Sequence, residues 1–228
     1  MITAVGNAVR VLRTHRTLVV ALVSALVAAA VTAAAILLTQ RSAPRPEPSV
    51  TVAVVGDSYA AGRLNRVVWP TLLAQRTGWS VANFALPGSG FAADGPGGYA
   101  FTWQVDRALA ARPDTVLLVG GIDDGGYLGT GNITQSAVDA IHKVIRAGKR
   151  VLVIGPTWFD QSVPPTVSGV NAEIRTAAEE TRVPFLDALD PPWLTPELML
   201  ADRSGPNDDG QSVIADKVAA WLRSEVSG

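Results

Sequence analysis

The chain has 228 residues, a net charge of −1 and no cysteine. This length suits one domain with a short appendage, and the lack of cysteine excludes disulfides, a thiol nucleophile and a Cys-ligated zinc site. Residues 1–48 hold five Arg and one Glu, which leaves 14 basic and 19 acidic side chains in residues 49–228. A mildly acidic domain without a basic stripe argues against nucleic acid as a partner.

A long uncharged segment lies near the N-terminus. Residues 17–39 contain no charged side chain, and a helix of this length, rising about 1.5 Å per residue, spans a hydrocarbon core of about 30 Å. Three Arg precede it within residues 1–16 and two follow it within residues 40–48. The positive-inside rule therefore favours a cytoplasmic N-terminus and an extracytoplasmic domain at residues 49–228.

We expect this segment to be an uncleaved signal anchor that makes the protein a single-pass protein of the cell membrane. A cleaved signal peptide, which would give a secreted form, is the alternative, although its apolar core is usually shorter. A buried core helix is disfavoured because soluble helices are rarely apolar on every face over this length. Residues 40–48 hold three prolines and are typical of an extended linker.

Short apolar runs alternate with helical patterns along residues 49–228. The apolar runs lie at 50–55, 80–84, 115–119, 150–154 and 184–187, and the helical patterns lie at 70–76, 102–111, 134–147, 167–181 and 208–226. This alternation predicts a three-layer α/β sandwich around a parallel sheet of about five strands. In such sheets the functional residues follow the carboxyl ends of the strands.

The residues directly after the apolar runs are therefore the candidate functional residues. Ser58 follows the first run in a Gly-Asp-Ser sequence, where a turn toward a helix would expose its hydroxyl beside backbone N–H groups. For this tripeptide alone, a serine that merely caps the helix is the alternative. The later strand ends supply Asn83-x-x-x-x-Gly88, Gly121-x-x-Asp124 and Asp202-x-x-x-Pro206-Asn207.

These four blocks, in this order, resemble the SGNH (GDSL-type) hydrolases over nearly the whole domain. The resemblance implies a flavodoxin-like sandwich and ester hydrolysis with Ser58 as the nucleophile. It implies an oxyanion hole formed by Ser58, Gly88 and a third-block Asn side chain, whose position Asp123 occupies here. It also implies a catalytic Asp at Asp202 and a catalytic His three residues later, where this chain has Gly205.

The changes at Gly205 and Asp123 remove a base and a hydrogen-bond donor. A serine hydroxyl is a weak nucleophile without a base, and an ionised carboxylate accepts hydrogen bonds where an Asn amide would donate. Loss of one oxyanion donor typically costs about 10²–10³ in rate, and loss of a triad His up to about 10⁶. The two histidines, His15 before the uncharged segment and His142 within a helical pattern, are not expected to replace the base.

Three routes would preserve activity despite these changes. Asp202, Asp208 or Asp209 could act as the base, directly or through a water. Burial of Asp123 beside Asp124 could keep it protonated, because two close carboxylates resist double ionisation, and a protonated Asp can donate. A partner protein could also supply the base.

Two functions follow from the resemblance and the expected location. The first is an esterase or acylhydrolase with an altered triad, which acts on ester or O-acetyl groups of envelope lipids or glycans. The second is a catalytically inactive SGNH-fold protein that binds an envelope ligand or a protein partner. The sequence predicts no cofactor and no metal, because Asp57, Asp123 and Asp124 lack metal-ligand spacing and residues 88–90 lack the third glycine of a dinucleotide fingerprint.

Overall fold

The computed structural model describes residues 27–32, 34 and 52–226. The chain divides into two compact units, Met1–Glu47 and Pro48–Gly228. The described residues of the first unit are helical, and no helix within the described ranges is both long and apolar enough to cross a membrane. Apart from residues 27–32 and 34, the expected cytoplasmic segment, anchor and linker (1–16, 17–39 and 40–48) lie outside the described residues. The membrane anchor therefore stays a prediction.

The second unit is built on a five-stranded, all-parallel sheet with the strand order β2-β1-β3-β4-β5. This is the order of flavodoxin-like folds. The central strands β1 and β3 pair from Val52 opposite Thr115 to Gly56 opposite Val119, so both end at the same edge. The strands are β1 (Val52–Gly56), β2 (Val81–Asn83), β3 (Thr115–Val119), β4 (Arg150–Ile154) and β5 (Phe185–Leu186).

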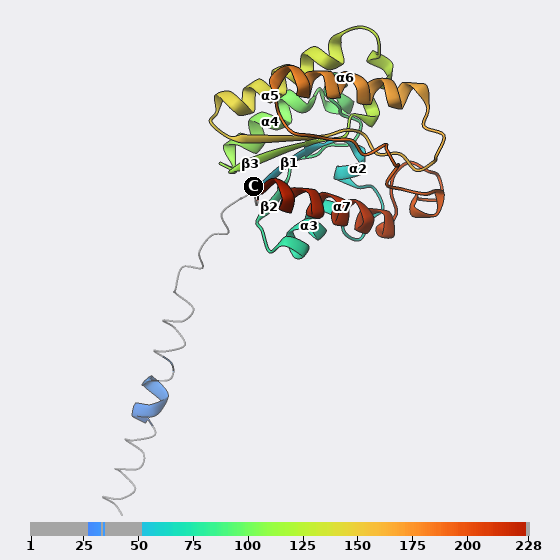
Figure 1. The fold of residues 1–228 in the computed structure, drawn as a ribbon. Coiled ribbons are helices and arrows are strands. Elements are labelled where there is room, and N and C mark those ends of the chain that lie inside the picture. Colours follow the sequence, from blue (N-terminus) through green and yellow to red (C-terminus); the bar gives the residue numbers. More distant parts are fainter. Residues whose placement is uncertain (1–26, 33, 35–51, 227–228) are drawn as a thin grey trace, which may run out of the picture. The chain divides into compact units, whose positions relative to one another are not determined.

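Helices cover both faces of the sheet (Figure 1). One face carries α4 (Phe101–Ala110), α5 (Asn132–Arg146) and α6 (Pro165–Thr181), and the other carries α3 (Trp69–Thr77) and α7 (Asp208–Val226). Side chains alternate between the faces along each strand. Val55 packs in the apolar cluster that contains Phe101, whereas its neighbour Val54 packs in the cluster that contains Trp69. Burial on both faces explains why the strands are continuous apolar runs.

The structure confirms the expected fold class, a three-layer α/β sandwich with a parallel sheet of five strands. The two edge strands, β2 and β5, are shorter than the runs at 80–84 and 184–187, and each pairs with one neighbour only. The sequence pattern did not resolve four short helical turns, all of which lie in connecting segments. These are α2 (Ser58–Ala61) and the 3₁₀ turns Gly95–Gly97, Ile122–Tyr127 and Pro196–Leu198.

Candidate active site

Ser58 is the first residue of α2 and follows the carboxyl end of β1. The preceding residue, Asp57, caps this short helix by accepting a hydrogen bond from the Tyr59 N–H at 2.9 Å. Gly56 is required for the tight turn, because a Cβ there would lie 2.8 Å from the Ala60 Cβ. The capped turn fixes Ser58 beside the ends of the neighbouring strands.

Asp57 ties the end of β1 to the end of β3. Its other carboxylate oxygen, Oδ2, accepts from the Gly121 N–H at 2.9 Å and from the Ile122 N–H at 3.1 Å. A Cβ at Gly120 would lie 2.0 Å from this oxygen, so only glycine permits the close approach. Burial, followed by the nearby charge of Asp123, raises the pKa of Asp57 to about 7 against the effect of these three N–H donors.

The Ser58 hydroxyl lies between two of the predicted oxyanion-hole residues. It donates to Asp123 Oδ2 at 2.9 Å and accepts from the Gly88 N–H at 2.8 Å. Gly88 has a φ of +72°, a conformation that side chains disfavour. The structure thus brings Ser58, Gly88 and Asp123 together from the ends of β1, β2 and β3. Burial raises the pKa of Asp123, and the hydrogen bond from Ser58 lowers it.

Asp124, beside Asp123, holds the loop that contains Gly88. Its side chain is fully buried and accepts from the backbone N–H groups of Phe91, Ala92 and Ala93, each at 2.8 Å. Burial raises the pKa of this carboxyl, while the three N–H donors lower it. Asp124 is thus engaged with the backbone, whereas Asp123 is directed at Ser58.

Gln104 on α4 is a further supporting residue that the sequence did not reveal. Its Oε1 accepts from the Gly56 N–H at 3.1 Å, and its Nε2 donates to Ser89 Oγ at 2.7 Å. The side chain is fully buried, and it joins the turn before Ser58 to the residue after Gly88. A polar residue within the apolar stripe of a helix was the only available signal.

Asp202 lies on the opposite side of the candidate site. Its Oδ1 accepts from the N–H and the hydroxyl of Ser204, and its Oδ2 lies 3.6 Å from Nη1 of Arg63. The Asp202 side chain is 53% exposed. The hydrogen bonds from Ser204, and then the charge of Arg63, lower its pKa. Within the described residues no hydrogen bond joins Asp202 to Ser58, so the geometry provides no direct proton transfer between them.

The other candidate bases are also held away from Ser58. Asp208 accepts from the N–H and the Nε of Arg66 and from Asn65, and the hydrogen bonds from Arg66 lower its pKa. His142 is exposed on α5, and Asp209 makes no side-chain hydrogen bond to Ser58 among the described residues. Among the three aspartates expected to replace the base, none contacts the serine.

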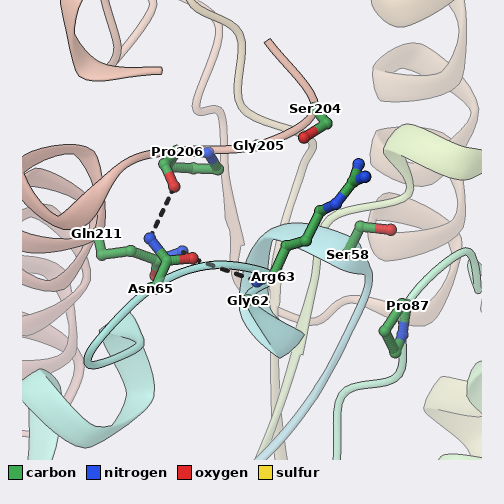
Figure 2. Close-up of a pocket in the computed structure, with 9 residues that line it drawn as sticks. All are labelled: Ser58, Gly62, Arg63, Asn65, Pro87, Ser204, Gly205, Pro206 and Gln211. Carbon is green, nitrogen blue, oxygen red and sulfur yellow. Dashed lines mark hydrogen bonds between the residues drawn. The ribbon is translucent and has the colours of Figure 1, made fainter. Parts of the chain in front are cut away.

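A cavity of about 300 Å³ opens beside Ser58 (Figure 2). A Cβ built on Gly205 would have Tyr59 Cδ1, at 3.9 Å, as its nearest neighbour, so the position has room for a larger side chain. Figure 2 shows the Ser58 hydroxyl pointing away from Gly205, in keeping with its bonds to Asp123 and Gly88. The lining residues are Ser58, Gly62, Arg63, Asn65, Pro87, Ser204, Gly205, Pro206 and Gln211.

No metal centre accompanies this cavity in the part of the chain that the structure describes. There, no group of three or more His, Cys, Asp or Glu side chains is placed to hold an ion. The carboxylates of Asp57 and Asp124 are instead occupied by backbone N–H donors. The groups that the structure places around Ser58 are the Asp123 carboxylate and the Gly88 backbone amide.

Comparison with known proteins finds sequence similarity over most of the chain. The model of the GDSL-like lipase/acylhydrolase family matches residues 54–213. A GDSL lipase of Mycobacterium tuberculosis is 30% identical over 196 residues, which cover 78% of this chain and 83% of the lipase.

Solved structures with the same fold include esterases. The psychrotrophic esterase EstA of a Pseudoalteromonas species matches with a TM-score of 0.58 and 18% identity, over 78% of this chain and 99% of that one. The acetyl xylan esterase Axe2 of Geobacillus stearothermophilus matches with a TM-score of 0.55 and 15% identity, over 73% and 91%. At these identities the structural matches establish the fold.

Proposed function

Because the chain belongs to the GDSL-like lipase/acylhydrolase family, we propose that it hydrolyses carboxylic esters with Ser58 as the nucleophile and without the usual histidine. The observation that carries this proposal is the placement of the Ser58 hydroxyl. It is held by the Gly88 N–H and the Asp123 carboxylate beside a cavity of about 300 Å³. A serine that served only to cap a helix would need neither contact.

The size of the cavity favours a substrate with a small acyl group next to Ser58. Its volume of about 300 Å³ is at the lower end of ligand pockets, which are typically about 300–1,000 Å³. Pro87 and Pro206 give it apolar surface, and Arg63 and Asn65 provide polar groups. An acetyl or short acyl ester fits this space, with the alcohol part extending toward solvent.

We place this activity outside the cytoplasm, on ester or O-acetyl groups of envelope lipids or glycans. The location is supported by the uncharged segment at residues 17–39 and its flanking arginines. The substrate class is supported by two similar proteins, one named a lipase and one an acetyl xylan esterase. In this proposal the membrane anchor keeps the domain close to its substrate.

A second candidate, an inactive protein that binds an envelope ligand or a protein partner, is favoured by one feature. The base position of the family holds Gly205, and Asp202 is engaged by Ser204 and Arg63 on the surface. If no other group activates Ser58, the cavity remains a binding site. The two candidates differ in whether turnover depends on the Ser58 hydroxyl.

Hydrolysis of p-nitrophenyl acetate by the purified full-length chain tests the proposal. Ser58→Ala should reduce turnover to the background rate, because the variant has no nucleophile. Ser162→Ala is the matched control, since Ser162 is exposed and its hydroxyl makes no hydrogen bond among the described residues. Equal background rates for the wild type and Ser58→Ala, also with acetylated glycans and short-chain lipids, would support the binding candidate instead.

A further inference from the structure

A carboxylate in direct contact with the nucleophile suggests where the missing base is. We infer that Asp123 is the general base of this enzyme, which takes the proton of Ser58, hydrogen-bonds the oxyanion through it and then gives it to the leaving oxygen. This inference rests on the proposed ester hydrolysis and identifies the group that replaces the histidine. It differs from the expectation that a carboxylate at the Asn position only weakens the oxyanion hole.

The contact between the two side chains carries the inference. Ser58 Oγ donates to Asp123 Oδ2 at 2.9 Å, which is within the range required of a general base. The Gly88 N–H donates to Ser58 Oγ at 2.8 Å and so stabilises negative charge on that oxygen as its proton leaves. The serine is therefore oriented toward a carboxylate and polarised by a backbone amide.

The other nearby carboxylates are already engaged by other groups. Asp57 and Asp124 each accept three backbone N–H groups, so their oxygens hold the loops in place. Asp202 is bonded to Ser204 and paired with Arg63. Asp123 has a different role, because the Ser58 hydroxyl is the one side-chain donor to its carboxylate in the described part of the chain.

The proton balance explains how a carboxylate can occupy an oxyanion hole. The O–H bond of Ser58 breaks, its proton bonds to Asp123 Oδ2, and the oxygen lone pair forms a bond to the acyl carbon. The carbonyl π electrons move to the carbonyl oxygen, so the negative charge passes from Asp123 to the oxyanion. Asp123 is neutral at that moment and donates a hydrogen bond, as the family's Asn amide would.

The same proton completes the reaction. When the tetrahedral intermediate collapses, the C–O bond to the alcohol breaks and the leaving oxygen takes the proton from Asp123, which leaves an acyl–Ser58 ester and an ionised carboxylate. A water then repeats the sequence, giving a proton to Asp123 and its oxygen to the acyl carbon, and Ser58 departs with that proton. Asp123 is the one protein group in this scheme that changes its charge during turnover.

The surroundings of Asp123 favour this role. Burial raises its pKa, which makes the carboxylate a stronger base than an exposed aspartate. Asp57 is buried near it, and the charges of the two carboxylates oppose each other when both are ionised. This repulsion favours movement of the charge from Asp123 to the substrate.

The Asp123→Asn variant distinguishes a general base from a residue that only weakens the oxyanion hole, because the two roles predict opposite changes in rate. If Asp123 is the base, the amide cannot take the proton, and kcat/KM for p-nitrophenyl acetate should fall by about 10²–10⁴. If Asp123 only weakens the oxyanion hole, the variant restores the family's donor and the rate should stay the same or rise. Asp139→Asn, on the exposed side of α5, is the matched control and should keep the wild-type rate.

Three further readouts separate the base role from a structural one. The wild-type kcat/KM should fall at acidic pH as Asp123 is protonated, and this fall should be absent in the residual activity of Asp123→Asn. Added formate should partly restore Asp123→Ala, since a free carboxylate can occupy the vacated space and take the proton. The rate at which a fluorophosphonate labels Ser58 should fall in parallel with kcat/KM, because labelling needs an activated serine but no acyl transfer to water.

The outcomes distinguish this inference from the proposed function. Ser58-dependent turnover that survives Asp123→Asn overturns the role of Asp123 and leaves the esterase proposal standing. A wild-type protein with neither Ser58-dependent turnover nor Ser58 labelling overturns both. Loss of turnover in Asp123→Asn, with labelling also slowed, an unchanged urea midpoint and recovery of Asp123→Ala in formate, supports both.

Discussion

The two sides of the candidate site differ in how they are built. On one side, the ends of β1, β2 and β3 bring Ser58, Gly88 and Asp123 into direct contact, and buried carboxylates hold the loops behind them. On the other side, the segment before α7 carries Asp202 on the surface and Gly205 beside an open cavity. Hydrogen bonds organise the first side around Ser58, and the second has Gly205 where the resemblance to the family implies a histidine.

This difference is in keeping with the proposed esterase activity. On the organised side Asp57 and Asp124 each accept three backbone N–H groups, most of them buried. Buried polar groups are costly unless they are paired. The organised side thus holds Ser58 within a network of paired polar groups, and in the proposed mechanism Asp123 supplies the base there.

The largest expected effect concerns the stability of the organised side. Asp57→Ala removes the acceptor of three backbone N–H groups, and each buried unsatisfied donor costs about 1–3 kcal/mol. We expect the free energy of unfolding in urea to fall by about 4 kcal/mol, against little change for Asp139→Ala on the surface of α5. A loss below about 1 kcal/mol would show that the two strand ends are not held together in this way.

The second prediction rebuilds the incomplete side. In an Asp123→Asn background, Gly205→His should raise kcat/KM for p-nitrophenyl acetate by about 10² or more over Asp123→Asn alone. Among the residues that the structure describes, a Cβ at Gly205 has only Tyr59 Cδ1 within 4 Å, at 3.9 Å, and the position lines the cavity, while Asp202 lies at the family's spacing before it. A Gly205→Ala variant controls for side-chain volume. If the folded double variant shows no gain in kcat/KM, a histidine at position 205 does not reach Ser58, and the segment before α7 is misplaced for catalysis.

The third prediction is a pH dependence of stability from the buried Asp57. Its pKa is about 7 in the folded protein, against about 3.9 in an unfolded chain. Between these values the folded state binds a proton that the unfolded state has lost, so stability should fall as pH rises from about 4 to about 7, by on the order of 1 kcal/mol per pH unit. Urea unfolding across this range measures the slope.

Two comparisons sharpen that measurement. Asp57→Asn should flatten the slope, because the amide does not titrate, although the raised pKa values of Asp123 and Asp124 leave a smaller dependence of the same sign. Asp202, whose pKa is lowered, acts in the opposite direction at more acidic pH. Stability that rises steadily from pH 4 to pH 7 would contradict the burial of an ionisable group behind Ser58.

The smallest expected effect is on the exposed side. Asp202→Asn should change kcat/KM by less than about twofold, because exposed ion pairs such as the one with Arg63 contribute little. Steady-state hydrolysis of p-nitrophenyl acetate checks this, with Asp139→Asn as the reference. A tenfold or larger loss of kcat/KM would contradict this difference between the two sides of the site, since it would show that Asp202 takes part in catalysis.

The sequence alone determined the layered fold and the order of its elements. Each strand is buried on both faces, so its apolar run is visible in a few consecutive residues, and each helix shows its own periodicity. The sequence also placed the candidate residues at the carboxyl ends of the strands, which meet at one edge of a parallel sheet, and the resemblance to the SGNH hydrolases singled out Ser58 and Gly88 among them. These features depend on local pattern and on topology, which short segments of sequence record.

The side-chain contacts around Ser58 are visible only in the tertiary structure. Ser58 and Asp123 are 65 positions apart in the sequence, and no local pattern indicates that their side chains share a proton. The same holds for Gln104, which joins the loops behind Ser58, and for Asp202, which fits the family's spacing but pairs with Arg63 on the surface. Side-chain direction depends on which loops pack together and on which buried N–H groups need an acceptor, and the folded chain alone settles both.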